Sequence, residues 1–481
     1  MTDAASALAD FALGLDPSRI PDEVAERACL HILDALGVAL AATTYPFARR
    51  GLAAIGSMAG GGDYPVIGRP ERLAMRDAAI ANGFLIHGLD FDDTHGESIV
   101  HTSASAVPTV LAAGLNADAT GPEALAAYLV AVEADARIGS VGGAFQKRGF
   151  HPTGVVGAFG ATLAAGRLWR MDPAALARAQ GITLSLAGGT LQFLEDGAWT
   201  KRIHPGWAAA CGLQAAGLAR GGFIGPAQAY EGRFGLYRTY LGEEWGEERD
   251  EACDHDGGQE AGGALASRLT DLGERWEMLR VGIKPYPVCH YNHAYADCVL
   301  ALVSEHGITP GDVDRMVARV HADEVDVVCE PAARKRRPQS DYEAKFSVQY
   351  LMAATLLKKR FTLEELEDDV LVDPDVLALA DRCGYEVDPE STFPRYFPGE
   401  VVVHTRDGRE LRHHEPVNRG ADQRPLSRAD IVAKFEDNAG RALARPAVRS
   451  LRDHVLDLPS LSRLATIPAA IPATIVAAVT A

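Results

Sequence analysis

The sequence predicts a mainly α-helical protein in which a large helical domain is interrupted by a smaller α+β module. Small and apolar residues recur at helical spacing from about residue 5 to residue 240, and again beyond residue 425. Between about 279 and 411 the pattern changes to short β-rich runs that alternate with helical stretches. We therefore expect a discontinuous helical domain at 1–278 and 412–481, with the α+β module inserted at 279–411.

The first helical domain shows repeated helix starts. Pro21-Asp22-Glu23 places a proline and two acids at the positive end of a helix, and the apolar residues behind it recur at helical spacing. Gly121-Pro122 and Asp172-Pro173 mark two further starts. A row of small residues that suits closely packed helices is formed by Gly154, Gly157 and Gly160.

The inserted module combines strand and helix patterns. Residues 317–322 and 400–405 are rich in β-branched side chains and predict strands. Asp407-Gly408 is a hairpin signal that leads into a further strand at 409–412. The runs that predict helices are 294–305, 344–357 and 363–379. Pro425-Leu426-Ser427 then starts a helix that returns the chain to the first domain.

Composition excludes several classes of protein. The formal net charge of -18 argues against nucleic-acid binding, because phosphate contacts rely on clustered lysine and arginine. The N-terminus lacks the pattern of a secretion signal, and the apolar runs fall short of the ~20 residues that cross a bilayer. The seven cysteines are scattered, which does not indicate a disulfide framework. We expect a cytoplasmic protein that binds neither nucleic acid nor membrane.

The stretch from His87 to His101 carries the strongest functional signal. It crowds three aspartates and three histidines between two apolar runs: Asp90, Asp92, Asp93, His87, His95 and His101. Because burying an unpaired charge is costly, this density predicts a cavity whose groups shift one another's pKa values. If the stretch stays helical, Asp90, Thr94 and His101 share one face. The structural alternative is a helix end with capping acids and solvated histidines.

Further candidates lie in separate segments, each with a structural alternative. His151 opens a helix before Pro152, and a histidine alone is more often structural there. Lys201 and Arg202 form a basic pair before Pro205-Gly206, which suits either a carboxylate clamp or a solvated loop.

The α+β module holds the remaining candidates. Lys284, Cys289 and His293 lie in a proline-stiffened segment where the two domains should meet. Such a backbone can hold side chains across a cleft, but a rigid linker has the same pattern. Tyr350 falls in an apolar helix, where core packing is the commoner explanation.

Cofactor motifs are absent from the sequence. Phosphate-binding loops, dinucleotide fingerprints, a nucleophile elbow and the His-Glu-x-x-His motif do not occur, which excludes nucleotide cofactors and serine hydrolysis. The Asp and His residues of 87–101 could ligate a divalent ion. Lys201 and Lys284 suit an anion better than a cation, so we assign no metal.

Taken together, these segments resemble the MmgE/PrpD family. The matching motifs occur in order along almost the whole chain: Leu-Asp-Phe-Asp-Asp-Thr (89–94), Gly-Phe-His-Pro-Thr-Gly (149–154), Thr-Lys-Arg-Ile-His-Pro-Gly (200–206), Lys-Pro-Tyr-Pro (284–287) and Ala-Lys-Phe-Ser-Val-Gln-Tyr (344–350). Pro-Leu-Ser with Ala-Lys-Phe (425–435) adds a C-terminal match. Each motif is weak alone, whereas the set is specific.

The resemblance implies an all-α domain, a smaller α+β lid, a homodimer and a site without a cofactor. Known activities of the family include 2-methylcitrate dehydratase, cis-aconitate decarboxylase and iminodisuccinate epimerase. The family's site carries over to Asp90, Thr94, His101, His151, Lys201, Lys284 and Tyr350. In the decarboxylase a histidine stands five positions after the lid lysine, where this chain has Cys289. The resemblance therefore disfavours decarboxylation.

We expect a hydro-lyase that removes a proton α to a carboxylate and eliminates water from a small di- or tricarboxylate. The side chains expected to bind this anionic substrate are Lys201, Arg202, Lys284, Cys289 and His293. His101 or Asp90 would act as the base. His151 or Tyr350 would act as the acid, with Thr94 beside them. An epimerase is the alternative within the family, and a catalytically inactive metabolite-binding protein is the alternative outside it.

Overall fold

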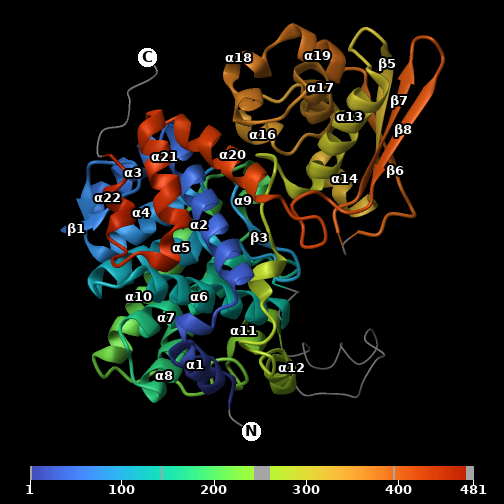
Figure 1. Ribbon diagram of the computed structural model, residues 1–481. Coiled ribbons are helices and arrows are strands. Elements are labelled where there is room, and N and C mark those ends of the chain that lie inside the picture. Colours follow the sequence, from blue (N-terminus) through green and yellow to red (C-terminus); the bar gives the residue numbers. More distant parts are fainter. Residues whose placement is uncertain (1–2, 142–144, 243–260, 394–395, 473–481) are drawn as a thin grey trace. The chain divides into compact units, whose positions relative to one another are not determined.

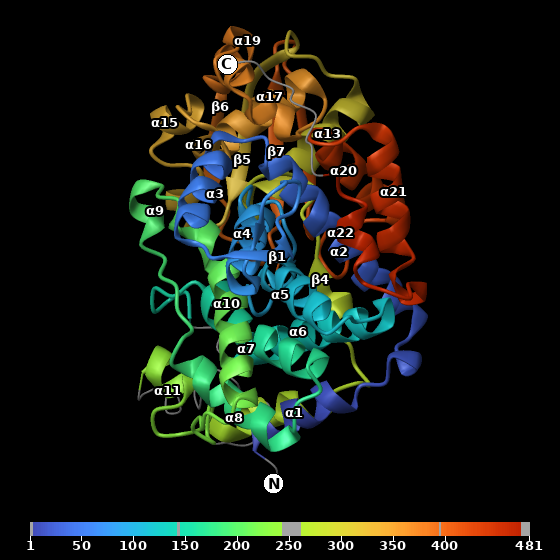
Figure 2. The same ribbon diagram turned by 90° about the vertical axis from the view of Figure 1, so that its left-hand side faces the viewer.

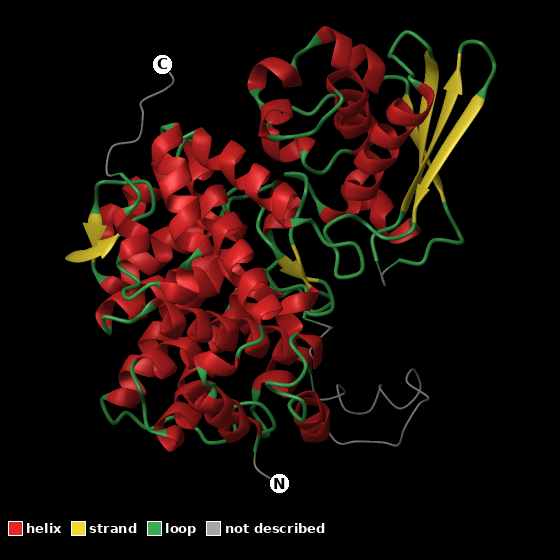
Figure 3. Ribbon diagram, in the orientation of Figure 1, coloured by secondary structure: helices red, strands yellow, loops and turns green. Residues whose placement is uncertain are grey.

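The computed structural model describes residues 3–141, 145–242, 261–393 and 396–472 (Figure 1). Helices make up most of this part of the chain, which confirms the mainly α-helical prediction (Figure 3). The chain forms two compact units, one of Met1–Gly282 with Ser427–Ala481 and one of Ile283–Leu426. The strand β8 (Glu410–Glu415) belongs to the second unit and runs past residue 411, where the sequence places the end of the module.

The first unit is built from helices. They are α1 (Ala4–Gly14), α2 (Asp22–Ala42), α3 (Pro46–Met58), α4 (Met75–His87), α5 (Thr102–Asn116), α6 (Gly121–Val141), α7 (Pro152–Leu168), α8 (Pro173–Leu184), α9 (Phe193–Asp196), α10 (Thr200–Arg220), α11 (Leu236–Leu241), α12 (Ala261–Arg268), α20 (Arg428–Gly440), α21 (Arg445–Leu456) and α22 (Thr466–Ala469). Short strands pair antiparallel as β1 (Gly61–Pro65) with β2 (Arg72–Leu73), and β3 (Thr94–His95) with β4 (Val281–Gly282). The predicted helix starts at Pro21, Gly121 and Asp172 are confirmed.

The helices α4, α5, α7 and α10 pack against one another in the middle of this unit (Figure 2). Glycines allow the close approach. A Cβ atom on Gly83 of α4 would lie 2.5 Å from the Cα atom of Gly206 on α10. A Cβ atom on Gly157 of α7 would lie 2.7 Å from Oγ of Ser105 on α5. The small-residue row on α7 therefore does serve close helix packing.

The second unit combines a four-stranded sheet with helices. Its strands have the order β6 (Cys383–Val387), β5 (Val313–Val320), β7 (Gly399–Thr405) and β8, with only β5 and β6 parallel. Its helices are α13 (His293–His306), α14 (Ala322–Val328), α15 (Ala332–Arg336), α16 (Asp341–Ala344), α17 (Val348–Lys358), α18 (Asp368–Leu371) and α19 (Pro374–Ala380). Figure 1 shows α13 and α17 on one face of the sheet, which they contact.

Two predicted helices of this unit are interrupted. The run 344–357 is split between α16 and α17, because the Ser347 side chain caps the new helix by accepting a hydrogen bond from the Tyr350 backbone N–H. The run 363–379 is divided into a 3-10 turn, α18 and α19. There the Asp373 side chain caps α19, which has Pro374 in its first turn. Local caps thus outweigh the continuous apolar pattern.

Among the residues that the structure describes, no single helix has the length and apolar character needed to span a membrane. The consecutive helices α2 and α3 reach that length and composition only as a pair, and the chain bends by 93° between them.

The contact between α4 and α10 generates a prediction for stability. Gly83→Ala should lower the free energy of unfolding by about 1–3 kcal/mol, because the new methyl group would meet the α10 backbone. Gly56→Ala, on exposed α3 with nothing within 4 Å of the added atom, should instead raise it by up to about 1 kcal/mol. Urea unfolding followed by circular dichroism measures both. Equal stability of the two variants would contradict the packing.

Candidate active site

The residues from His87 to His101 form a loop rather than a helix face. The helix α4 ends at His87, where a side chain at Gly88 would collide with the Phe47 ring at 2.6 Å. Asp90 then adopts a left-handed backbone conformation with φ 53°, which no helix tolerates. His101 precedes the first turn of α5. The expectation that Asp90, Thr94 and His101 share a helical face is therefore wrong, although the fold still gathers them.

Asp92 lies at the centre of this loop, fully buried, and contacts two imidazoles. Its Oδ2 atom lies 2.9 Å from Nδ1 of His87 and 3.3 Å from Nδ1 of His101. The hydroxyl of Thr94 lies 3.2 Å from the same Nδ1 of His101. A carboxylate in this position accepts hydrogen bonds from both rings, which keeps their protons on Nδ1 and leaves each Nε2 as an acceptor. Asp92 thus fixes the orientation of both rings.

Lys201 brings a positive charge to the same loop. Its Nζ atom lies 2.8 Å from Oδ1 of Asp90. A carboxylate oxygen of Asp90 lies within 4.8 Å of a ring nitrogen of His87, a ring nitrogen of His101 and a carboxylate oxygen of Asp92. Both members of the ion pair keep some exposure, with 15% of the Lys201 side chain accessible and 8% of that of Asp90. Ligand groups can therefore reach the lysine.

The local structure around Lys201 differs from the predicted loop. The helix α10 begins at Thr200, so Lys201 lies in its first turn, and Pro205 and Gly206 continue the helix instead of ending it. Gly206 is required there because α10 crosses the backbone of α4 at this residue. Arg202 is buried, with its guanidinium 3.9 Å from the centroid of the Phe47 ring.

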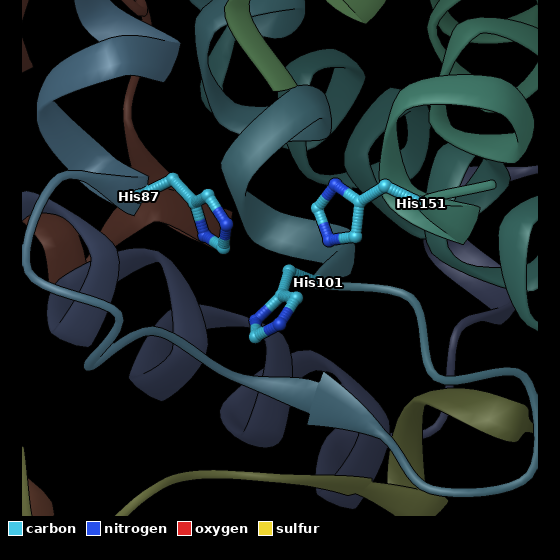
Figure 4. Close-up of side chains that lie close together, drawn as sticks. All are labelled: His87, His101 and His151. Carbon is cyan, nitrogen blue, oxygen red and sulfur yellow. The ribbon is translucent and has the colours of Figure 1, made fainter. Parts of the chain in front are cut away.

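His151 completes the cluster from a third helix. It precedes the first turn of α7, as predicted, and its ring centroid lies 5.7 Å from that of His87 and 6.1 Å from that of His101 (Figure 4). Its Nδ1 atom lies 3.0 Å from Nδ1 of His204 on α10. The end of α4 and the starts of α5 and α7 thus converge on one buried group of imidazoles.

Burial controls the charge of these groups. It lowers the pKa of His87 to about 4, with Asp92 opposing the shift, and lowers the pKa of His151 well below its usual value. It also lowers the pKa of His204 to about 4, and the charge of Lys201 lowers the pKa of all three rings further. Burial opposes ionisation of Asp92, but His87 and His101 hold its pKa well below the usual range. Near neutral pH His87, His151 and His204 are therefore neutral, whereas the Asp92 carboxylate is ionised.

A second buried network supports the loop from behind. Asp93 accepts hydrogen bonds from Nδ1 of His31 at 2.7 Å and from the backbone N–H of Ser103 at 3.0 Å. Lys434 on α20 donates to the Phe91 carbonyl at 2.8 Å and pairs with Asp34 at 2.8 Å. The C-terminal segment therefore fixes the backbone on which Asp90 and Asp92 lie.

Four of the predicted site residues lie in the second unit. Lys284 and His293 are buried and Cys289 is partly exposed, and His293 contacts the Val288 carbonyl through Nε2 at 3.2 Å. Tyr350 is fully buried and donates a hydrogen bond to the Glu365 carbonyl at 2.7 Å. Within the first unit the structure gathers Asp90, Thr94, His101, His151 and Lys201. The roles of all these residues remain predictions.

Sequence reasoning singled out two of the residues that orient this group and missed the other two. They are His87, Asp92, His204 and Lys434. The density of ionisable residues at 87–101 signals the first two, and Ala-Lys-Phe near the C-terminus signals Lys434. Only the fold shows which of these groups meet. Within the described part of the chain, two overlapping sets of buried side chains could hold a metal ion: His87 with His101 and His151, and His87 with Asp90, Asp92 and His101.

Both parts of the sequence match one protein family. Residues 6–248 match the MmgE/PrpD N-terminal domain, and residues 286–458 match the MmgE/PrpD C-terminal domain. These matches span most of the chain, which therefore belongs to the MmgE/PrpD family.

Its relatives include enzymes of nearly the same length. The chain is 28% identical to the cis-aconitate decarboxylase of Homo sapiens, over 93% of this chain and 90% of the relative. It is 28% identical to that of Mus musculus, over 91% and 87%, and 26% identical to that of Aspergillus terreus, over 95% and 93%. The similarity extends over both units, and the relatives are lyases.

The neutral imidazoles predict a pH dependence of stability. As the pH falls from 7 to 5, the unfolded chain protonates His204 near its ordinary pKa of 6.5, while the folded protein keeps it neutral until about pH 4. The unfolded state then binds more protons, so stability falls with falling pH, by about 2 kcal/mol at pH 5 for this residue. His204→Gln should lose correspondingly less stability over this range, as measured by urea unfolding.

Between pH 8 and 9 the variant and the wild-type protein should respond in parallel, because histidine is neutral in both states there. An identical loss of stability in the two proteins between pH 7 and 5 would show that folded His204 takes up its proton normally.

Proposed function

We propose that this protein is a lyase that removes a proton α to a carboxylate and eliminates water from a small di- or tricarboxylate. The observation that carries the proposal is the pairing of a base with a cation in one site. Asp92 contacts His101 and orients its ring. Lys201 pairs with Asp90, whose carboxylate lies close to His101 and Asp92. Such a proton is weakly acidic, so its removal needs both an acceptor and a charge that stabilises the enolate.

His101 supplies the acceptor. With its Nδ1 proton directed at Asp92, Nε2 takes the α-proton, and Asp92 stabilises the imidazolium that results. The electron pair left on carbon forms the double bond as the carbon–oxygen bond breaks. The departing hydroxide leaves as water with the proton that the His101 imidazolium returns. Atoms and charge balance without an external reagent.

Lys201 supplies the positive charge. In the free protein its Nζ atom is paired with Asp90 at 2.8 Å, and a substrate carboxylate would share or replace that partner. The negative charge that builds on this carboxylate during proton removal strengthens the interaction, so the lysine favours the transition state over the ground state. Thr94, whose hydroxyl contacts His101, would help to orient the base.

Decarboxylation is the second candidate reaction. It is supported by the relatives, which are named cis-aconitate decarboxylases and resemble the chain over both units. The same lysine would stabilise the carbanion that loss of carbon dioxide leaves, and His101 in its protonated form would return a proton to it. Cys289, at the position where the decarboxylase has a histidine, favours dehydration over this alternative.

Proton NMR of the purified protein incubated with 2-methylcitrate, citrate or cis-aconitate distinguishes these reactions. Dehydration should yield an unsaturated acid from a hydroxy acid without release of carbon dioxide. His101→Gln should then lower kcat by about 10²–10⁴-fold, because it removes the base. Lys201→Met should raise KM and lower kcat together. His454→Gln, on α21, should leave both constants unchanged.

Release of carbon dioxide from cis-aconitate would contradict the proposed dehydration and support decarboxylation, the second candidate reaction. Full activity of the His101→Gln protein would contradict the role of His101 in either reaction. Failure to convert all three acids or to exchange their α-protons with solvent deuterium would contradict the proposed chemistry.

A further inference from the structure

We propose that Lys434 is a positioning residue for the reaction: by anchoring the loop at Phe91, it holds the Asp92 carboxylate where it can orient His101. This role rests on the proposed function, in which His101 takes the α-proton. Lys434 lies on α20, which packs against α2 (Figure 1). It acts on the reaction through the loop and not through contact with the substrate.

Lys434 contacts Phe91 in two ways. Its Nζ atom donates a hydrogen bond to the Phe91 carbonyl at 2.8 Å and lies 3.8 Å from the centroid of the Phe91 ring. Charge-assisted hydrogen bonds and cation–π contacts are both stronger when they are buried. The carbonyl belongs to the planar peptide unit that joins Phe91 to Asp92, so fixing its direction also fixes the start of the Asp92 backbone. Lys434 therefore limits where the Asp92 side chain can lie.

The loop depends on such anchors because its backbone is strained. Asp90, two residues before Asp92, has a φ of 53°, a conformation that costs energy in a residue other than glycine and persists only where the surroundings enforce it. On the other side of Asp92, the Asp93 carboxylate accepts a hydrogen bond from the Ser103 backbone N–H at 3.0 Å. Asp92 thus lies between two anchored neighbours, and loss of the lysine contact releases one of them.

The charged end of Lys434 is itself held in place. Its Nζ atom lies 2.8 Å and 3.0 Å from the two carboxylate oxygens of Asp34 on α2, and only 8% of the lysine side chain and 1% of the Asp34 side chain are accessible. Burial raises the pKa of Asp34 to about 6 although Lys434 opposes the shift, so the acid is ionised near neutral pH. The two helices approach closely, since a Cβ atom on Gly37 would lie 3.0 Å from the Phe435 ring. The ion pair therefore connects the loop to both helices.

The kinetic test is the double variant Lys434→Met with Asp34→Asn, which removes the contact to Phe91 without leaving a buried charge unpaired. We expect kcat to fall by about 10–100-fold, because Asp92 no longer holds the base in one orientation. KM should change by less than about twofold, because Lys201 still binds the substrate carboxylate. Lys434→Arg keeps the charge and the donor groups, so it should retain more activity than the double variant.

Arg428→Met is the matched control. Arg428 also lies on α20 and pairs with Glu26 on α2, but this ion pair is exposed, with 55% and 51% of the two side chains accessible, whereas Lys434 is buried against the loop. The control variant should therefore keep the wild-type kcat and KM. A loss of kcat equal to that of the double variant would overturn the specific role of Lys434.

A spectroscopic test needs no turnover and so separates this role from the proposed function. Nitrogen-15 NMR of histidine-labelled protein, with His101→Gln to assign the signal, reports the ring tautomer of His101 at pH 7. We expect one tautomer, with the proton on Nδ1, in the wild-type and Arg428→Met proteins, and a mixture of both tautomers in the double variant. Circular dichroism checks that each variant is folded.

The proposal is overturned if the folded double variant keeps the wild-type tautomer of His101, or if the Arg428→Met protein shows the same mixture as the double variant. Should the double variant not fold, Lys434→Gln, whose side chain is one bond shorter, must give the mixture, and an unchanged tautomer there overturns the proposal as well. If the wild-type protein converts none of the acids, the proposed reaction fails, while the spectra still decide whether Lys434 positions His101.

Discussion

The Asp92 carboxylate accepts hydrogen bonds from two buried imidazoles, and the organisation of the site depends on this arrangement. Among the residues that the structure describes, Asp92 is the one carboxylate that contacts Nδ1 of both His87, the last residue of α4, and His101, which lies just before α5. Burial alone would protonate the acid, whereas the two rings keep it ionised. The imidazoles therefore stabilise the ionised form of the acid, whereas burial outweighs the acid and keeps His87 neutral.

The rest of the first unit holds this group in place. Glycine contacts let α4 approach α10, so the ends of these helices bring His87 near Lys201. Lys434 connects the C-terminal segment to the loop through Asp34 and the Phe91 carbonyl. The segment that follows the second unit thus contributes, through α20, to the support of the loop.

The fold was predictable because its signals are local and repeated. Helix starts at Pro21, Gly121 and Asp172, and the hairpin at Asp407-Gly408, depend on neighbouring residues alone. Breaks inside apolar runs were not predictable, because Ser347 and Asp373 cap new helices against the periodicity. Local capping hydrogen bonds decide such cases.

The structure brings several of the predicted site residues together, but in a geometry that the sequence did not predict. The density of ionisable residues predicted Asp90 and His101, and the family resemblance supported Lys201. The loop geometry, however, depends on the left-handed turn at Asp90, which a helical pattern does not indicate. The role of Asp92 depends on a contact between rings that are fourteen positions apart in the sequence, and pairing of Lys201 with Asp90 crosses 111 positions. Contacts of this kind follow from packing, which no single sequence displays.

The most direct test of the central arrangement is the position of the ring protons. Nitrogen-15 NMR of histidine-labelled protein at pH 7, with His87→Gln and His101→Gln to assign the signals, reports which nitrogen of each ring is protonated. If Asp92 orients both rings, His87 and His101 carry their protons on Nδ1, and Asp92→Asn removes that preference. Protons on Nε2 of these two rings, or the same tautomers in the Asp92→Asn protein, would contradict the account.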